Sequence, residues 1–212
     1  AVISPNFLQK YEMFSSLFEC FILRNKENIG NNMYKDNLDV LYKYYSKDIC
    51  GEDEYKKKEG KIAFLSPSKM NDPFDCNCVF DDESKADDLF KLFCTSPVND
   101  NILMWSHYGS NHEGYCFEYS KFDIINKILE ENIDGILIIG NVNYYRKRKK
   151  HIIKSKKLSF TNLKEYVDAA FSKYEIWNYE KEFRFVIVSE NNKDVYNIQV
   201  KINNLYAGCN AN

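Results

Sequence analysis

Hydrophobic and polar positions recur with two different periods along the chain, and each period predicts one kind of element. Near the start, apolar residues recur at helical spacing over residues 7–22, with polar residues opposite them. This pattern predicts an amphipathic helix that ends near Arg24. The polar segment at residues 25–37 follows it and is typical of a linker. We therefore divide the chain into an N-terminal helix with its linker, residues 1–37, and a domain at residues 38–212.

Within the domain, short segments rich in β-branched and aromatic residues predict strands, and segments with helical periodicity predict helices. The predicted strands lie at residues 38–45, 61–65, 93–97, 114–119, 133–145, 177–188 and 195–202. The predicted helices lie at residues 82–92, 102–108, 121–131 and 163–176. Asn101 offers an N-cap for the second helix, and Gly109 offers its end. The order of elements lacks a Gly-rich βαβ signature and favours an α+β domain, with a central mixed or antiparallel sheet and flanking helices.

Composition and charge narrow the class of protein. A hydrophobic content of 44% and an aromatic content of 16% are typical of a folded globular chain. Eight of the 29 Lys and Arg residues lie at residues 146–157 without an acid, so the rest of the chain has 21 basic and 31 acidic residues. The seven cysteines follow no framework spacing, which predicts free thiols in a reducing cytoplasm. We find no run of 18 apolar residues and no secretory leader, so we expect no membrane partner.

The densest chemistry lies in the segment Met-Trp-Ser-His-Tyr-Gly at residues 104–109, where Trp105, His107 and Tyr108 follow each other closely. On the predicted helix His107 and Tyr108 share a face, so we expect them to reach one pocket. A His beside a Tyr suits hydrogen bonding to a ribose or a phosphate. The alternative is an aromatic helix packed in the core with a satisfied His.

A second group of polar residues lies in the last third of the chain. If residues 177–188 form a strand, Glu180, Glu182 and Arg184 share one face of it. One interpretation is a catalytic carboxylate that the neighbouring Arg keeps ionised and oriented. The other is a polar strand face with a cross-strand ion pair.

Two further segments have a functional and a structural interpretation. The segment Asn71-Asp72-Pro73-Phe74-Asp75 either binds a ligand or is a turn held by Asx hydrogen bonds. The basic run, residues 146–157, either binds nucleic-acid phosphates or is a solvated loop, because it lacks interleaved aromatics apart from the two tyrosines just before it. The Cys and His spacings match no zinc pattern, so we expect no metal.

Several motifs together carry a resemblance to a known family. They are Leu41-Tyr42-Lys43-Tyr44, Phe64-Leu65-Ser66-Pro67, Asn71-Asp72-Pro73-Phe74-Asp75, Phe93-Cys94-Thr95, Met104-Trp105-Ser106-His107-Tyr108-Gly109, His112-Glu113-Gly114-Tyr115 and Trp177-x-x-Glu180-x-Glu182-x-Arg184. With them, residues 38–210 resemble a bacterial family of domains of unknown function, number 2971. The first strand of that family often carries an Arg where this chain has Tyr45.

The order of these motifs is also similar to that of ADP-ribosyltransferases, which implies NAD as a substrate. In those enzymes a carboxylate stabilises the oxocarbenium-like charge that forms when the glycosidic bond of NAD breaks. The resemblance implies that Glu182 is this carboxylate and that Glu180 or Arg184 orients it. The implied catalytic set is Glu182, Glu180, Arg184 and His107, and the implied binding set is Lys43, Tyr45, Ser66, Asn71, Asp72, Trp105 and Tyr108.

Three functions stay open at this point. The first is an NAD-using transferase or an NAD-cleaving toxin or phage-defence effector. The second is a non-catalytic domain that binds nucleic acid through Arg146–Lys157, and a small-molecule nucleotide is a separate candidate partner. The third is a partner-binding domain, with the N-terminal helix as a homodimer interface, and it predicts that Lys43, His107 and Glu182 do not converge.

Overall fold

A computed structural model of the chain describes residues 20–23, 39–48, 59–131, 133, 135–157, 162–190 and 195–211. Most of the predicted N-terminal helix lies outside these residues, and so does the predicted domain boundary at residue 37. The described part, Cys20–Leu23, is strand β1 and not the end of a helix. It pairs antiparallel with β7, Ile136–Asn141. The prediction was wrong here because pairing with a distant strand overrides a local helical period.

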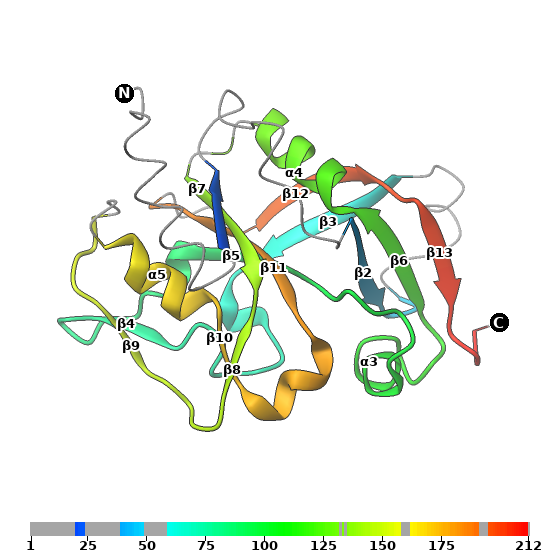
Figure 1. Cartoon of the computed structure of the whole chain (residues 1–212), viewed down its shortest axis with the longest axis horizontal. Helices are drawn as coiled ribbons and strands as arrows, with labels where there is room; N and C mark the ends of the chain where they lie inside the picture. The colour runs from blue at the N-terminus through cyan, green and yellow to red at the C-terminus, as the bar shows by residue number, and fades with distance from the viewer. Residues whose placement is uncertain are drawn as a thin grey trace.

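The largest layer is a six-stranded sheet with the order β1-β7-β11-β5-β3-β12 (Figure 1). Every neighbouring pair in it is antiparallel. The remaining strands are β11 (Phe183–Val188), β5 (Phe90–Thr95), β3 (Glu59–Leu65) and β12 (Val195–Lys201). The predicted α+β class with an antiparallel central sheet is therefore confirmed.

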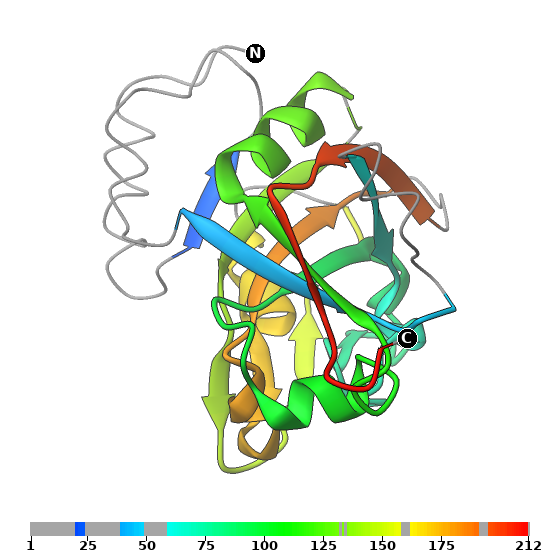
Figure 2. The ribbon, with the colours of Figure 1, turned by 90° about the vertical axis from the view of Figure 1, so that its right-hand side faces the viewer.

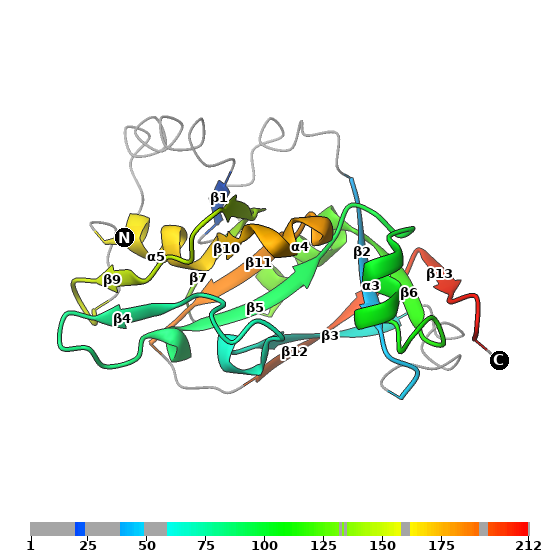
Figure 3. The same cartoon turned by 90° about the horizontal axis from the view of Figure 1, so that it is seen from below.

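A second, three-stranded sheet has the order β13-β6-β2 and is also antiparallel. Its strands are β13 (Asn204–Ala207), β6 (Tyr115–Ser120) and β2 (Val40–Tyr45). It lies in front of the larger sheet in Figure 2, and β2 crosses the direction of β3 and β5 in Figure 3. Tyr42 and Ser96 join the sheets, since each backbone N–H donates to the other residue's carbonyl, at 2.7 and 2.9 Å.

Two short parallel pairs bring distant segments together on the side of the large sheet that carries α5 (Leu163–Ala170). One pair is β4 (Cys78–Phe80) with β9 (His151–Ile153), and the other is β8 (Asn143–Tyr145) with β10 (Ser172–Tyr174). The basic run therefore lies beside the turn at residues 71–77, where the His151 N–H donates to the Asn77 carbonyl at 2.8 Å.

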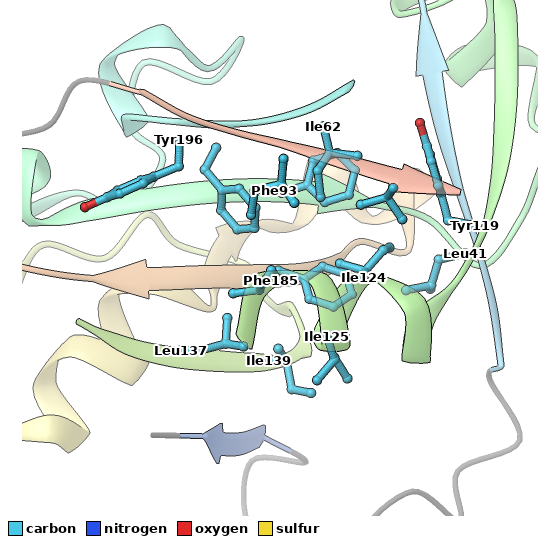
Figure 4. Packing of buried hydrophobic residues seen from close by; sticks show 14 of the residues in the cluster. Leu41, Ile62, Phe93, Tyr119, Ile124, Ile125, Leu137, Ile139, Phe185 and Tyr196 are labelled. Atoms are coloured by element: carbon cyan, nitrogen blue, oxygen red, sulfur yellow. The ribbon is translucent and has the colours of Figure 1, made fainter. Parts of the chain in front are cut away.

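The two faces of the large sheet have separate cores. Alternate residues of β11 point to opposite faces, and all six are buried. Phe185 packs with Ile124 and Ile125 of α4 (Lys121–Glu130), as Figure 4 shows. Val186 packs with Val167 of α5 on the other face. No helix among the described residues is long and apolar enough to cross a membrane.

The helix α3 (Ile102–His107) begins as predicted, because the Asn101 side chain accepts hydrogen bonds from the N–H groups of Leu103 and Met104. The described residues also form three short 3-10 helices: η2 (Pro67–Lys69), η3 (Asp87–Leu89) and η4 (Glu175–Glu180).

Three predicted elements were wrong in type or extent. Residues 82–92 are not a helix, since η3 leads directly into β5 at Phe90. The helix predicted over residues 163–176 ends at Ala170, because β10 then pairs with β8. The strand predicted over residues 177–188 begins only at Phe183, after η4. In each case a pairing between distant segments decides the structure, and a local pattern does not contain it.

Candidate functional site

Glu180, Glu182 and Arg184 come together, but not through the alternation of a strand. Glu180 ends η4, and Lys181 then adopts a left-handed backbone with φ 45°. This conformation turns the chain, so that Glu182 and Arg184 enter the buried side of β11 beside Glu180. Both glutamates and Arg184 are buried. The sequence predicted a face that lines solvent or a cleft, and the structure instead places this face inside the protein.

Arg184 is fully buried, and each of its N–H groups has an acceptor. Its Nε donates to Glu182 Oε1 at 2.7 Å, and its Nη2 donates to Glu182 Oε2 at 3.0 Å. Its Nη1 and Nη2 also donate to the two carboxylate oxygens of Asp75, both at 2.7 Å, and Nη1 donates to the Ala170 carbonyl at 2.6 Å. This full set of partners offsets the cost of burying a charge.

Lys173 of β10 is the second buried cation. Its Nζ lies 2.5 Å from Glu180 Oε2, 3.0 Å from Glu182 Oε2 and 3.8 Å from Asp75 Oδ2. We call Asp75, Lys173, Glu180, Glu182 and Arg184 the buried ion network. Three carboxylates face two cations, so the network has one negative charge in excess when every group is ionised.

The pKa values of the two glutamates shift in opposite directions, so Glu182 carries its negative charge more readily than Glu180. Burial opposes the charge on Glu182, but Arg184 and Lys173 outweigh burial and hold its pKa well below the usual range. Burial and the nearby charge of Glu182 raise the pKa of Glu180, which has the Lys173 ammonium as its single cation. The Tyr108 hydroxyl donates to Glu180 Oε1 at 2.5 Å, and burial and Glu180 raise the pKa of this tyrosine. Glu180 is therefore the member of the network best placed to take up a proton.

A surface pocket lies next to this network, and Lys173 is one of its lining residues. Its volume is about 310 Å³, including the solvent at its open mouth. We call it the basic–aromatic pocket; its lining residues are Asp72, Phe74, Asn77, Tyr145, Lys147, Arg148, Lys149, His151, Ser172, Lys173 and Tyr174.

Aromatic rings hold the cations of the pocket in place. The Arg148 guanidinium lies 4.1 Å from the ring centroid of Phe74 and 5.2 Å from that of Tyr174. The Lys149 Nζ lies 3.1 Å from the ring centroid of Tyr145. The basic run has few aromatics in sequence, but the fold supplies rings from the turn at residues 71–77 and from β10.

The rest of the basic run does not join the pocket. Lys156 pairs with Asp82 at 2.6 Å, and Lys156 and the two Ser84 hydrogen bonds lower the pKa of Asp82. The Lys156 Nζ also lies 5.3 Å from the ring centroid of Phe80. Among the residues that the structure describes, no salt bridge connects Lys147, Arg148 or Lys149 to an acid. The pocket thus gathers three cations of the run that have no acidic partner among the described residues.

His151 lines the pocket with an unsatisfied nitrogen. Its Nε2 is buried and has no hydrogen-bond partner within the described part of the chain. Burial lowers the pKa of His151, with Lys149 and Lys164 acting in the same direction and Asp168 against them. The imidazole is therefore neutral at neutral pH, with an unused polar atom at the pocket.

The structure separates His107 and Tyr108, which the sequence predicted in one pocket. His107 is the exposed last residue of α3, and its ring centroid lies 6.1 Å from that of Tyr179. Tyr108 turns inward and binds Glu180. Lys43 lies elsewhere, with its Nζ 5.6 Å from the ring centroid of Phe93. Among the described residues, no hydrogen bond or salt bridge connects Lys43 or His107 to Glu182.

The other predicted binding residues make contacts within the fold, except Asp72, which lines the pocket. Trp105 donates from Nε1 to the Asn99 carbonyl at 2.8 Å and packs edge-on against Tyr44. The Tyr45 hydroxyl lies 3.3 Å from that of Tyr119. Ser66 is buried, and its carbonyl accepts from the Lys69 N–H.

Asn71 and Asp72 were predicted to shape the rim of a pocket. Asn71 is exposed and does not line the basic–aromatic pocket, whereas Asp72 does. Asp72 Oδ1 also accepts from the Phe74 N–H at 3.0 Å, which is the Asx hydrogen bond of the structural interpretation. The turn is therefore both structural and part of the pocket wall.

Sequence reasoning missed Lys173, Asp75 and His151 as members of the site. Lys173 fell inside a predicted helix, where a Lys indicates a solvated position. Asp75 was considered only as part of the segment at residues 71–75, which either binds a ligand or forms a turn. His151 was considered only as part of the basic run. Within the described residues, no group of three or more His, Cys, Asp or Glu side chains is placed to hold a metal ion.

These features define an α+β domain with a buried ion network under a basic pocket. The family model described as Protein of unknown function (DUF2971) matches residues 104–185. This match runs from α3 into β11 and confirms the predicted family over these residues. Comparison with curated proteins and with solved structures gave no match.

Proposed function

We propose that the protein binds the phosphate group of a nucleotide in the basic–aromatic pocket. The observation that carries this proposal is the convergence of Lys147, Arg148 and Lys149, which have no salt bridge among the described residues, with three aromatic rings at one hollow. Cations that lack an acidic partner attract phosphate, and ring faces accept a base or a ribose.

The size of the pocket favours part of a large ligand over a whole small one. Pockets for small molecules usually have volumes of about 300–1,000 Å³. The enclosed space of this hollow is only about 10 Å³, and the value of about 310 Å³ includes open solvent, so the hollow is a shallow depression that can contact a group at the surface but cannot enclose a whole ligand. The rest of the ligand then extends over the surface. A nucleic-acid binding domain is therefore favoured over an enzyme that encloses a dinucleotide.

Binding measurements test this proposal directly. Labelled single-stranded oligonucleotide and NAD are titrated into the wild type, Lys149→Ala and Arg148→Ala, with Lys61→Ala as a control on β3 outside the pocket. We expect the two pocket variants to weaken binding and the control to match the wild type. Because phosphate binding releases counterions, affinity should also fall steeply with salt. If no ligand binds at about 50 mM salt, the proposal is wrong.

A second candidate is NAD cleavage by an ADP-ribosyltransferase-like mechanism, as a toxin or phage-defence effector. The supporting observation is that Glu180 and Glu182 both bind the Nζ of Lys173, which lines the pocket. A carboxylate at this position stabilises an oxocarbenium-like charge on a bound ribose if the Lys173 side chain moves aside. Under this proposal Glu180, which keeps a single cationic partner, faces the substrate, and Arg184 holds Glu182 in place.

Release of nicotinamide from NAD tests this second candidate. We expect wild-type turnover that Glu180→Gln and Glu182→Gln abolish and that Glu131→Gln, an exposed control on α4, leaves unchanged. Circular dichroism of each variant separates loss of activity from loss of fold. Equal release by the wild type and Glu180→Gln would rule the mechanism out.

A further inference from the structure

A row of aromatic rings continues from the pocket across the surface. The ring centroid of Tyr179 lies 6.1 Å from that of His107 on one side and 6.1 Å from that of Trp177 on the other. The rings of each pair are tilted by 36° and 37°. We call these three residues the aromatic row. The Lys173 Nζ lies 5.1 Å from the ring centroid of Trp177, so the row begins where the pocket ends.

The row is built on two packed elements. His107 ends α3, and Trp177 and Tyr179 belong to η4. The Asn101 Nδ2 donates to the Tyr179 carbonyl at 2.8 Å, which fixes the two elements relative to each other. In Figure 1 both lie at the bottom of the molecule, with η4 (orange) beside β8, whereas α4 lies at the top. The row therefore has a rigid support beside the basic run.

This surface carries features that a solvated face does not need. Ile102, Leu103 and Ile176 are 72%, 46% and 56% exposed, and all three lie on α3 or η4. The Trp177 Nε1 is buried without a hydrogen-bond partner among the described residues. Exposed large apolar side chains on these two neighbouring elements indicate a surface that binds a partner.

We propose that the aromatic row and the basic–aromatic pocket together bind one single-stranded nucleic acid. This inference rests on the phosphate binding proposed for the pocket. Residues 147–149 contact phosphates, and unpaired bases of the same strand stack on the exposed parts of the rings. Paired bases of a duplex cannot offer their faces to these rings, so the surface selects single strands.

Charge distinguishes a nucleic acid from a protein segment as the occupant. The cations at residues 147–149 lie at one end of the row and attract a polyanion. Glu175 opposes them, since it lies on η4 before the row and its Oε2 is 3.9 Å from Arg146 Nε. Removing this acid should therefore strengthen binding of a nucleic acid and should not strengthen binding of a basic peptide.

The experiment measures fluorescence anisotropy of labelled oligothymidines of roughly 3 to 16 nucleotides and of a duplex of matched length. Variants of the row are Tyr179→Ala and His107→Ala. Tyr179→Phe keeps the ring, and Phe122→Ala removes an exposed aromatic from α4 as a control. Each lost stacking contact should weaken binding of the longer oligothymidines about 5- to 150-fold. Tyr179→Phe and Phe122→Ala should bind like the wild type.

These binding measurements test the proposal for the pocket and the proposal for the aromatic row separately. Lys149→Ala should weaken all lengths, whereas Tyr179→Ala should weaken the long ones and spare the shortest. Glu175→Gln should bind the long oligothymidines more tightly than the wild type, with Glu131→Gln as its charge-matched control. Unchanged binding by folded Tyr179→Ala, or equal affinity for the duplex, overturns the row while the pocket stands. Absence of all binding overturns both proposals.

Discussion

Arg184 and Asp75 form a two-pronged ion pair, in which Nη1 and Nη2 of the arginine each lie 2.7 Å from one carboxylate oxygen. Both residues are buried. The pair joins a central strand of the large sheet to the turn at residues 71–77, which forms a wall of the basic–aromatic pocket. The position of the pocket wall thus depends on an ionic contact inside the protein.

Replacing Arg184 should destabilise the protein strongly. Arg184→Met leaves Asp75 and Glu182 buried without their main cation, and loss of one partner of a buried pair costs about 3–5 kcal/mol. Arg184→Lys keeps the charge but cannot supply two parallel hydrogen bonds to each carboxylate, so it should also lose stability. Urea unfolding measures both changes.

Lys164→Met is the matched control, because it breaks an exposed pair with Asp168 on one helix turn. Such pairs contribute less than about 1 kcal/mol. If Arg184→Lys unfolds at the urea concentration of the wild type, the two-pronged pair does not stabilise the fold.

Glu180 should make stability depend on pH in a predictable direction. Burial and Glu182 raise its pKa above the ordinary value of 4.5, so the folded state holds this proton more tightly than the unfolded state. The resulting stabilisation is complete below pH 4.5 and is lost as the pH rises through the folded pKa. The wild type should therefore gain stability relative to Glu180→Gln as the pH falls from neutral toward this window, and thermal unfolding at several pH values measures the difference.

Titration of Glu182 does not interfere with this measurement. Its pKa lies well below the usual range, so its ionic contribution is present above the unfolded pKa and is lost only as the pH falls through the folded value. A wild type and a Glu180→Gln variant with parallel pH curves would show that Glu180 holds no proton in the fold.

The turn between α3 and β6 should tolerate no side chain at Gly114. A Cβ there would lie 2.2 Å from the Tyr45 carbonyl oxygen, which is backbone and cannot rotate away. We expect Gly114→Ala to cost at least about 1–3 kcal/mol, as overpacking does, measured by thermal unfolding. Asn111→Gly is the control in the same turn, because Asn111 has φ 52° and glycine adopts this conformation freely. An unaltered melting temperature for Gly114→Ala contradicts the prediction.

Local patterns predicted those elements whose own residues determine them. The N-cap at Asn101 and the helical period of residues 121–131 located α3 and α4 within one residue. In contrast, β5 is buried on both faces and paired on both sides, so its sequence lacks the alternation that marks a strand. The same limit applies to β1 and β10, which exist through pairing with β7 and β8.

The site, like the fold, was predictable only where residues close together in the sequence determine it. The spacing of Glu180, Glu182 and Arg184 indicated correctly that they lie close together. Asp75 lies 109 positions from Arg184, and Lys173 reaches the glutamates from a strand that only tertiary pairing forms. His107 was misplaced because α3 ends there, so the shared helix face that grouped it with Tyr108 does not continue.

His151 should make ligand binding depend on pH. Burial lowers its pKa below the ordinary 6.5 in the free protein, with Lys149 and Lys164 adding to this and Asp168 opposing it. A phosphate bound in the pocket favours the charged imidazole and raises that pKa, so affinity should increase as the pH falls from about 8 to about 6. Oligothymidine is the right probe, because its phosphodiesters do not titrate in this range.

The test compares the pH dependence of oligothymidine affinity in the wild type and His151→Gln. Glutamine keeps a polar side chain of similar size but does not titrate, so the affinity of His151→Gln should change little with pH. His112→Gln is the control, since His112 bonds Ser106 at 3.1 Å and does not line the pocket. It should keep the wild-type slope. Equal slopes in the wild type and His151→Gln would mean that the imidazole takes up no proton when phosphate binds, and its unsatisfied Nε2 would then be only a feature of packing.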